Sequence, residues 1–186
     1  MKRRLPGSGS GLTAKVLSLA KPVRLFVLDV DGVLTDNGMY LDGQYGCSKR
    51  FDIQDNLGLL LIQRAGIEVA LLSGLANDQA RQLAKDLGIT EFHGGHHQKM
   101  PVLEGMLACR GLTLAQTAYM GDDWLDAPVM ARVGLPMAPG DAQPEIRRLA
   151  AWVSTRPGGR GAVRQAVRFL LMAQGKLGAS WGCPLD

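Results

Sequence analysis

The sequence predicts an α/β fold in which a doubly wound, mostly parallel sheet carries helices on both of its faces. From residue 24 to residue 173, short apolar stretches alternate with longer stretches expected to be helical, which is the pattern of successive βαβ units. The first apolar stretch, LFVLDV, is apolar at five of its six positions, as in a strand buried on both faces. The expected architecture is therefore Rossmann-like.

The individual elements follow from residue patterns taken in chain order. Residues 42–43, Asp-Gly between two short apolar runs, signal a hairpin, Gly66 and Gly88 end two helices, and Pro101 fits the first turn of another helix. Strands are expected at residues 24–30, 39–41, 48–51, 68–72, 91–93, 118–120, 135–138 and 152–154. Helices are expected at residues 57–65, 77–87, 99–109, 125–132, 144–149 and 161–173, with a short one near 12–20.

One domain is expected over residues 23–177, between a flexible basic tail at residues 1–22 and a C-terminal tail at residues 178–186. The chain has 186 residues and a net charge of +4, and 46% of its residues are hydrophobic, which suits a single globular core. It has no lysine-rich block interleaved with aromatic residues and no apolar run approaching the ~20 residues of a membrane span. Neither a nucleic-acid partner nor a membrane partner is expected.

The cysteines predict a reducing, cytoplasmic location. Cys47, Cys109 and Cys183 are widely spaced and form no CxxC pair, so neither a disulfide framework nor a zinc site is expected. The start MKRR imitates the basic end of a signal peptide, but GSGS follows it where an apolar core would be needed.

Four groups of polar residues stand where an expected strand passes into the next helix. They are Asp29 with Asp31, Ser73 with Gly74, Lys99 alone, and Asp122, Asp123 and Asp126 of GDDWLD. Each group alone fits an ordinary helix cap, turn or solvated side chain. Two groups of carboxylates at two strand ends, however, would repel each other unless a cation lay between them, and oxygen ligands favour Mg²⁺. Mg²⁺ between Asp29 and Asp122 would hold a phosphate oxygen.

These groups are sufficient for phosphoryl transfer. An oxygen of Asp29 could attack phosphorus and form an aspartyl-phosphate. Asp31, expected to be kept protonated by its surroundings, would protonate the leaving alkoxide and then activate the hydrolytic water. Ser73, the Gly74 amide and Lys99 would neutralise the phosphoryl oxygens.

The motifs that contain these residues resemble those of a known family. DVDGVLTD, Ser-Gly after the next strand, an isolated Lys and then GDD are similar, in order and spacing, to the haloacid dehalogenase superfamily of phosphatases. The hairpin segment GMYLDGQYGCSKRFDIQD leaves no room for a cap domain. With the later VGLPMAPGDAQPEIRRLAAWV and STRPGGRGAVRQAV, it resembles the capless subgroup that includes the 3-deoxy-D-manno-octulosonate (KDO) 8-phosphate phosphatases. The resemblance covers roughly residues 24–177.

The resemblance implies a Mg²⁺ phosphatase that acts on KDO 8-phosphate, in the synthesis of a lipopolysaccharide precursor. It implies metal ligation by Asp29, the backbone carbonyl of Asp31, and Asp122. It further implies a homotetramer in which a hairpin of one subunit helps to cover the site of another. Asp123 and Asp126 would support the site by orienting loops or neighbouring ligands, and contact of Asp123 with the metal through water stays open.

The chain also departs from the family pattern. Leu75 stands where the family carries arginine after Ser-Gly, and Leu60 and Leu83 stand where lysine or arginine is frequent. The substrate carboxylate needs a cation, so the same chemistry on another phosphorylated ulosonic or nonulosonic acid remains an alternative. A catalytically weak scaffold is a third possibility, against which the intact Asp29 and Asp122 argue.

Four further residues are candidates for binding the sugar acid. Asp52, Asp55 and Asn56 lie in FDIQDNLG, where Asn56 replaces the family's glycine, and Arg160 lies in GGRGAVR. The three histidines of FHGGHHQK, His93, His96 and His97, are expected to form a loop before Lys99 and not a metal site. Trp124 is expected to line either the pocket or an interface.

Overall fold

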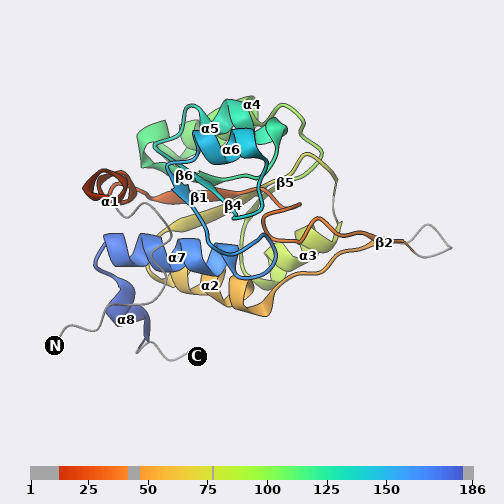
Figure 1. Ribbon diagram of the computed structural model, residues 1–186, viewed down its shortest axis with the longest axis horizontal. Helices are drawn as coiled ribbons and strands as arrows, with labels where there is room; N and C mark the ends of the chain where they lie inside the picture. Colours follow the sequence, from red (N-terminus) through yellow and green to blue (C-terminus); the bar gives the residue numbers. More distant parts are fainter. Residues whose placement is uncertain (1–12, 42–46, 77, 182–186) are drawn as a thin grey trace.

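The computed structural model describes residues 13–41, 47–76 and 78–181. In this part of the chain, six strands form one sheet in the order β5-β4-β1-β6-β7-β8, and every neighbouring pair is parallel (Figure 1). The strands are β1 Leu25–Leu28, β4 Glu68–Leu72, β5 Glu91–His93, β6 Thr117–Met120, β7 Leu135–Ala138 and β8 Trp152–Val153. The predicted parallel α/β sheet is confirmed.

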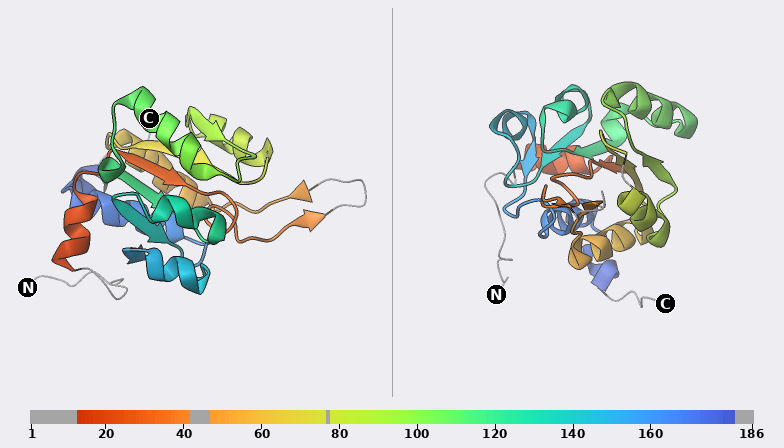
Figure 2. Two further views of the ribbon diagram at one scale, coloured as in Figure 1. Left: turned by 90° about the horizontal axis from the view of Figure 1, so that it is seen from above. Right: turned by 90° about the vertical axis from the view of Figure 1, so that its right-hand side faces the viewer.

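Helices cover both faces of the sheet (Figures 1 and 2). One face packs against α1 Ala14–Ala20, α2 Ile53–Arg64, α3 Asp78–Asp86 and α7 Ala162–Ala173. The other packs against α4 Lys99–Arg110, α5 Ala127–Met130 and α6 Pro144–Leu149. Strand β1 contributes side chains to the hydrophobic clusters on both faces of the sheet, because successive side chains of a strand point to opposite faces. Phe26 and Leu28 join the first cluster, and Leu25 and Val27 join the second.

A two-stranded antiparallel hairpin follows β1 and stands apart from the sheet. Its strands are β2 Tyr40–Leu41 and β3 Cys47–Ser48, and Figure 2 shows them projecting well beyond the body of the molecule. The side chains of Met39, Tyr40 and Leu41 are 55%, 63% and 75% exposed. The expected hairpin is confirmed, although the Asp-Gly turn proposed at residues 42–43 lies outside the described residues.

The largest departures from the predicted helix bounds occur in two helices, and both arise from the caps of those helices. Helix α2 begins at Ile53 and not at residue 57, because the Asp52 carboxylate accepts hydrogen bonds from the amides of Gln54 and Asp55. The helix expected at residues 125–132 is divided into a 3₁₀ turn, η2 Trp124–Asp126, and the four-residue α5. Here Asp123 and Asp126 form a reciprocal capping box, which starts the segment as a tight turn. A second 3₁₀ turn, η1, spans Leu114–Gln116.

Both segments expected to be tails contain helix where they are described. Helix α1 packs against α7, with Val16 and Ala20 buried four residues apart on one helical face. Among the described residues, the packed part of the chain therefore includes α1, which lies inside the expected N-terminal tail. Helix α8, Leu177–Trp181, occupies the start of the expected C-terminal tail. Residues 1–12 and 182–186 lie outside the described residues, and the domain limits at 23 and 177 stay predictions.

In the stretches that the structure describes, no helix is both long enough and apolar enough to cross a bilayer.

Candidate active site

An acidic cavity of about 270 Å³ opens at the carboxyl edge of the sheet. Strands β1 and β6 are neighbours, so the loops that follow them meet at this edge. Six of the predicted site residues line the cavity: Asp29, Asp31, Gly74, Lys99, Asp122 and Asp123. Two of the four predicted polar groups therefore line the cavity completely. The GDDWLD group contributes two of its three acids, and the Ser-Gly group contributes its glycine.

Asp29 follows β1 directly and is almost completely buried. Its Oδ1 accepts a hydrogen bond of 2.7 Å from the amide of Val30, and its Oδ2 lies 3.0 Å from the Nζ of Lys99. Burial raises the pKa of Asp29 well above its usual value, the nearby carboxylate of Asp126 raises it further, and Lys99 opposes both. A buried carboxylate of this kind needs added positive charge to act as a nucleophile.

Lys99 is the first residue of α4, and it bridges two acids. Its Nζ lies 3.0 Å from Asp29 Oδ2 and 2.6 Å from Asp126 Oδ1. Burial alone would lower the pKa of Lys99, but the charges of Asp29 and Asp126 outweigh it and hold that pKa above its usual value. The side chain is therefore a fixed positive charge at the wall of the acidic cavity.

Asp126 is fully buried and is saturated with hydrogen bonds. Its Oδ1 accepts from Lys99 Nζ and from the hydroxyl of Tyr119, and its Oδ2 accepts from the amides of Asp122 and Asp123 at 2.9 and 3.2 Å. These bonds fix the GDD loop relative to α4. The geometry fits the supporting role predicted for Asp126, which stays a prediction.

The acids at this edge form a compact cluster that suits a divalent cation. Asp29, Asp122 and Asp126 each offer a carboxylate oxygen, and the three oxygens lie within 4.8 Å of one another. Burial raises the pKa of Asp122 to about 7, and the charges of Asp126 and Asp123 add to this effect. Such mutual repulsion is relieved when a cation binds, and an all-oxygen set favours Mg²⁺. Because the oxygens of Asp126 are already committed, Asp29 and Asp122 are the better candidates for ligands.

The loop after β1 brings its backbone unusually close to Asp122. Gly32 has φ of +79°, and a Cβ atom at this position would lie 2.0 Å from Asp122 Oδ2. Asn37, with φ of 60°, donates from Nδ2 to the same oxygen at 3.0 Å. Asn37 lines the acidic cavity and was not predicted. Its signal in the sequence is only that of an asparagine in a turn, a type that tolerates positive φ.

Asp31 is held by a residue that the sequence analysis did not single out. Its Oδ1 lies 2.6 Å from the Nζ of Lys49, which comes directly after β3 of the hairpin. Its Oδ2 is buried and has no hydrogen-bond partner among the described residues. The nearby Asp36 accepts from the amide of Gly38 and from Arg160 Nη2, so Asp36 shapes the loop.

The Ser73–Gly74 segment lies at the end of β4. Ser73 is fully buried, and its Oγ accepts a hydrogen bond of 3.3 Å from the amide of Leu75. Gly74 lines the acidic cavity, and a Cβ at this glycine would lie 3.2 Å from Leu125. The arrangement is compatible with the predicted phosphate-binding role of both residues, which stays a prediction.

The predicted sugar-acid residues lie around the hairpin base and α2. Asp52 caps α2, and the buried Asp55 accepts from the amides of Gly161 and Arg164 at 3.0 and 2.6 Å. Arg160 forms an ion pair of 3.0 Å with Asp36. Asn56 keeps a buried Oδ1 without a hydrogen-bond partner in the described structure. None of the four candidates is among the described residues that line the acidic cavity, so their role in binding substrate stays a prediction.

The rim of the acidic cavity is more apolar than its floor. Leu75 and Leu125 line it and are 49% and 46% exposed, and the adjoining Trp124 is 66% exposed. His97 also lines it, whereas His93 pairs with Glu91 at 2.7 Å. The other two leucines at departures from the family pattern, Leu60 and Leu83, are partly buried against the core.

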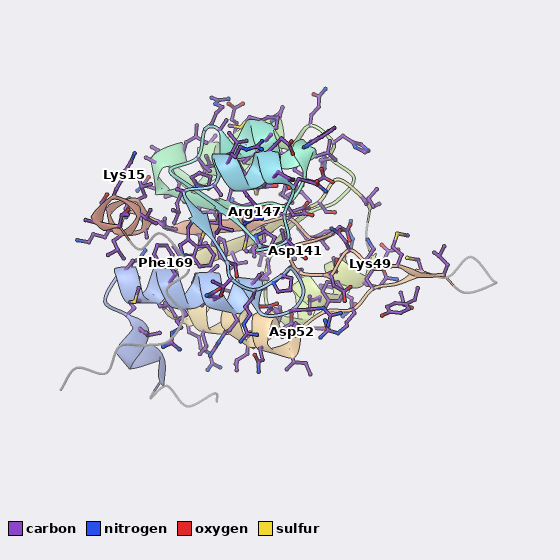
Figure 3. The ribbon with its side chains drawn as sticks, in the orientation of Figure 1. Lys15, Lys49, Asp52, Asp141, Arg147 and Phe169 are labelled. Atoms are coloured by element: carbon purple, nitrogen blue, oxygen red, sulfur yellow. The ribbon has the colours of Figure 1, made fainter. Side chains whose placement is uncertain are left out.

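A larger groove of about 750 Å³ lies beside α6 and β8. Arg147 and Arg148 line it together with Asp141, whose Oδ1 accepts from the amide of Gly158 (Figure 3). Its described lining residues include one carboxylate, which is already bonded, and no pair of acids, and the hydroxyls of Ser154 and Thr155 donate to the side chain of Gln165. The smaller acidic cavity, which gathers four carboxylates and a lysine, is therefore the better candidate for the active site.

The sheet order, the acids after β1 and β6 and the lysine at the start of α4 define a hydrolase of the haloacid dehalogenase superfamily. A solved structure described as a HAD superfamily (subfamily III A) hydrolase from Legionella pneumophila superposes with a TM-score of 0.88 at 35% identity, covering 90% of this chain and 92% of that one. No family model matches the chain.

Similar proteins of known function place the chain in one family within this superfamily. The 3-deoxy-D-manno-octulosonate 8-phosphate phosphatase KdsC of Escherichia coli K12 is 37% identical over 171 residues, which cover 92% of this chain and 91% of that protein. The Moraxella catarrhalis phosphatase of the same name, solved with magnesium, phosphate and KDO, has a TM-score of 0.87 at 31% identity and covers 89% of this chain and 95% of that one. The chain belongs to the 3-deoxy-D-manno-octulosonate 8-phosphate phosphatase family.

Proposed function

We propose that the protein is a Mg²⁺-dependent phosphatase that hydrolyses KDO 8-phosphate to KDO and phosphate. The observation that carries this proposal is the convergence of Asp29, Asp31, Lys99 and Asp122 around one cavity. The membership of the chain in a phosphatase family supports it. The reaction supplies KDO for lipopolysaccharide synthesis, as the name of the family implies.

The site's own residues account for both steps of the reaction. An oxygen of Asp29 attacks phosphorus, the bond from phosphorus to the sugar oxygen breaks, and an aspartyl-phosphate forms. Asp31 gives its proton to the departing oxygen. In the second step Asp31 takes a proton from water, whose oxygen attacks the same phosphorus and releases phosphate and free Asp29.

The remaining groups bind and neutralise the phosphoryl group. Lys99, Ser73 and the Gly74 amide are assigned to the phosphoryl oxygens. Asp29, the backbone carbonyl of Asp31, and Asp122 would hold Mg²⁺, which when bound offsets the negative charge of both the carboxylates and the phosphate. Asp126 keeps Lys99 and the GDD loop in place, and Asp123 supports the same loop.

The identity of the sugar acid depends on the rim of the cavity. Leu75 supplies no cation for a substrate carboxylate, although it lies at the cavity and is 49% exposed. Because of this observation, another phosphorylated ulosonic acid or a nonulosonate 9-phosphate is the second candidate substrate. A catalytically weak scaffold is disfavoured, because the nucleophile, its lysine and the acid cluster are all assembled.

A homotetramer is the proposed assembly. The hairpin carries three exposed apolar side chains in succession, Met39, Tyr40 and Leu41, and it projects from the body (Figure 2). Leu125 at the rim of the acidic cavity and the adjoining Trp124 are also exposed. Covering one apolar surface with the other, between copies of the chain, would bury both. Light scattering tests this, and a mass near that of the monomer would contradict it.

A cytoplasmic location is proposed from the thiol chemistry. The described cysteines, Cys47 and Cys109, are both free thiols, which suits a reducing compartment.

The experiment that tests the function is phosphate release from a panel of substrates, with Mg²⁺ and with EDTA. The panel holds KDO 8-phosphate, a nonulosonate 9-phosphate and a hexose 6-phosphate. We expect Mg²⁺-dependent turnover with the highest kcat/KM for KDO 8-phosphate. A preference for the nonulosonate would assign the alternative substrate, and the absence of turnover on all three would reject the proposed function.

A further inference from the structure

Lys49 is a buried lysine in direct contact with the predicted acid/base residue. Its side chain is 7% exposed, and its Nζ lies 2.6 Å from Asp31 Oδ1. Lys49 follows β3, at the point where the hairpin joins the body of the molecule (Figure 3). A lysine is rarely buried unless it is paired, and this one is buried against a residue of the acidic cavity.

The contact divides the two oxygens of Asp31 between different tasks. Oδ1 is occupied by Lys49, whereas Oδ2 is buried and has no hydrogen-bond partner in the described structure. A buried acceptor without a partner is costly, and in a folded protein it calls for an explanation. The simplest explanation is that Oδ2 is the oxygen kept for the reacting groups, and that Lys49 fixes the carboxyl plane by holding the other oxygen.

Stability alone does not account for Lys49. The base of the hairpin is already tied to the body by other bonds, from Arg50 Nη1 to the carbonyl of Gly159 at 2.6 Å and from Gln79 Nε2 to the carbonyl of Cys47 at 2.7 Å. A buried ion pair gains little stability over an apolar pair of the same size, because both charges lose their hydration. The pair is therefore better explained by what it does for Asp31.

We propose that Lys49 is a positioning residue for the phosphatase reaction, which holds Asp31 through Oδ1 so that Oδ2 exchanges the proton with the leaving oxygen and with water. This inference rests on the proposed function of the site. It also makes the hairpin part of the catalytic apparatus of its own chain, because Lys49 comes directly after the returning strand of the hairpin.

The inference predicts a dependence on the leaving group. A sugar alkoxide is a poor leaving group that needs the proton from Asp31, whereas p-nitrophenolate leaves with little assistance. Misplacing Asp31 should therefore lower kcat/KM for a sugar phosphate much more than for p-nitrophenyl phosphate. The ratio kcat/KM is the quantity to compare, since it reports the steps up to formation of the aspartyl-phosphate and is not affected by its later hydrolysis.

The test compares Lys49→Met, Asp31→Asn and the double variant in the full-length protein. For Lys49→Met we expect kcat/KM for KDO 8-phosphate and for hexose 6-phosphate to fall about 100-fold, within the range of general acid catalysis, and that for p-nitrophenyl phosphate to fall less than about threefold. Because Lys49 acts through Asp31, the double variant should be no slower than Asp31→Asn alone. Lys49→Arg should recover part of the activity.

The matched control is Gln79→Ala, which removes a different hairpin contact and leaves Lys49 in place. It should retain wild-type kinetics on all substrates. Circular dichroism confirms folding of each variant, and Lys49→Gln replaces Lys49→Met if the latter does not fold.

Three outcomes would overturn the inference. In the first, Lys49→Met lowers kcat/KM equally for aryl and sugar phosphates. In the second, the fold-loss in kcat/KM of the double variant equals the product of the fold-losses of the two single variants. The third is a loss confined to the KM of KDO 8-phosphate with hexose 6-phosphate unaffected, which would make Lys49 a carboxylate-binding residue. Failure of the proposed function looks different, because the wild type would then release no phosphate or Asp29→Asn would remain active.

Discussion

Lys99 and Asp126 form an ion pair of 2.6 Å in which the two side chains are 1% and 0% exposed. Asp126 also accepts hydrogen bonds from Tyr119 and from two amides of the GDD loop. One buried carboxylate thus joins β6, the GDD loop and α4, and the nucleophile Asp29 contacts this unit through Lys99.

Asp126→Ala is expected to destabilise the fold by about 3–5 kcal/mol, because it leaves a buried lysine short of a partner and two amides without an acceptor. Urea unfolding measures this. The control is Glu104→Ala, which breaks the exposed pair between Glu104 and Arg132 and should cost less than about 1 kcal/mol. A similar loss in the free energy of unfolding for the two variants would show that the buried contacts of Asp126 stabilise the fold no more than an exposed ion pair does.

Asp29→Asn is expected to abolish turnover without lowering stability in the absence of metal. The neutral amide removes a carboxylate whose pKa is raised by burial and by Asp126, so it relieves repulsion while leaving no nucleophile. Phosphate release and thermal melting are the two measurements. Residual activity comparable to that of the wild type would assign the nucleophile elsewhere, and a large loss of stability would mean that Asp29 is mainly structural.

Mg²⁺ is expected to stabilise the protein more at pH 8 than at pH 6. In the metal-free protein the pKa of Asp122 is raised to about 7, above the value of about 3.9 in an unfolded chain. The folded state then holds a proton that the unfolded state has lost, so the stability due to this group is present below about pH 4 and lost as the pH rises through about 7. Mg²⁺ binds the carboxylate form and replaces that proton.

The increase in Tm on adding Mg²⁺, measured at the two pH values, tests this dependence on pH. Asp122→Asn is the control and should show a smaller increase with little difference between pH 6 and pH 8. A larger increase at pH 6 in the wild type would contradict the prediction.

Leu75→Arg is expected to lower the KM for KDO 8-phosphate by about tenfold or more, since a charge-assisted hydrogen bond to the substrate carboxylate contributes about 1.5–3 kcal/mol. The substituted position lines the acidic cavity and is half exposed. Hexose 6-phosphate, which has no carboxylate, serves as the control substrate and should keep its KM. An equal change for both substrates would place the carboxylate away from this part of the rim.

Gly32→Ala is expected to abolish Mg²⁺-dependent turnover. The glycine has φ of +79°, and an added Cβ would lie 2.0 Å from Asp122 Oδ2, so the loop or the carboxylate must move. Gly66→Ala is the control, because Gly66 also has positive φ but no atom lies within 4 Å of its Cβ position. Both substitutions strain the backbone, and only the first should remove activity beyond what its stability loss explains.

Much of the fold and the floor of the site could be predicted from the sequence. The carboxyl ends of neighbouring parallel strands share one edge of the sheet, so the placement of Asp29 and Asp122 after β1 and β6 is enough to bring them together. Lys99 was predictable for the same reason, as the residue that opens the helix after β5. These inferences need only the order of the elements.

The contacts that were missed depend on the paths of loops. Lys49 reaches Asp31 across 18 residues through a projecting hairpin, and Asn37 reaches Asp122 across 85 residues from a turn with positive φ. A residue pattern reports periodicity and turn type but not the direction in which a loop returns. For the same reason, the pairing of Arg160 with Asp36 could not be predicted, although Arg160 was singled out.

The hydrogen bonds that Asp55 accepts from the amides of Gly161 and Arg164 determine the stage of translation at which the protein can become active. When a ribosome has made residue 130, every proposed catalytic group has been translated. The helix that carries Asp55 still lacks the N-terminus of α7 against which it is buried. Chains that stall before residue 164 are therefore expected to contain all the proposed catalytic residues but to have no activity. Phosphatase activity is expected to arise only near the end of translation.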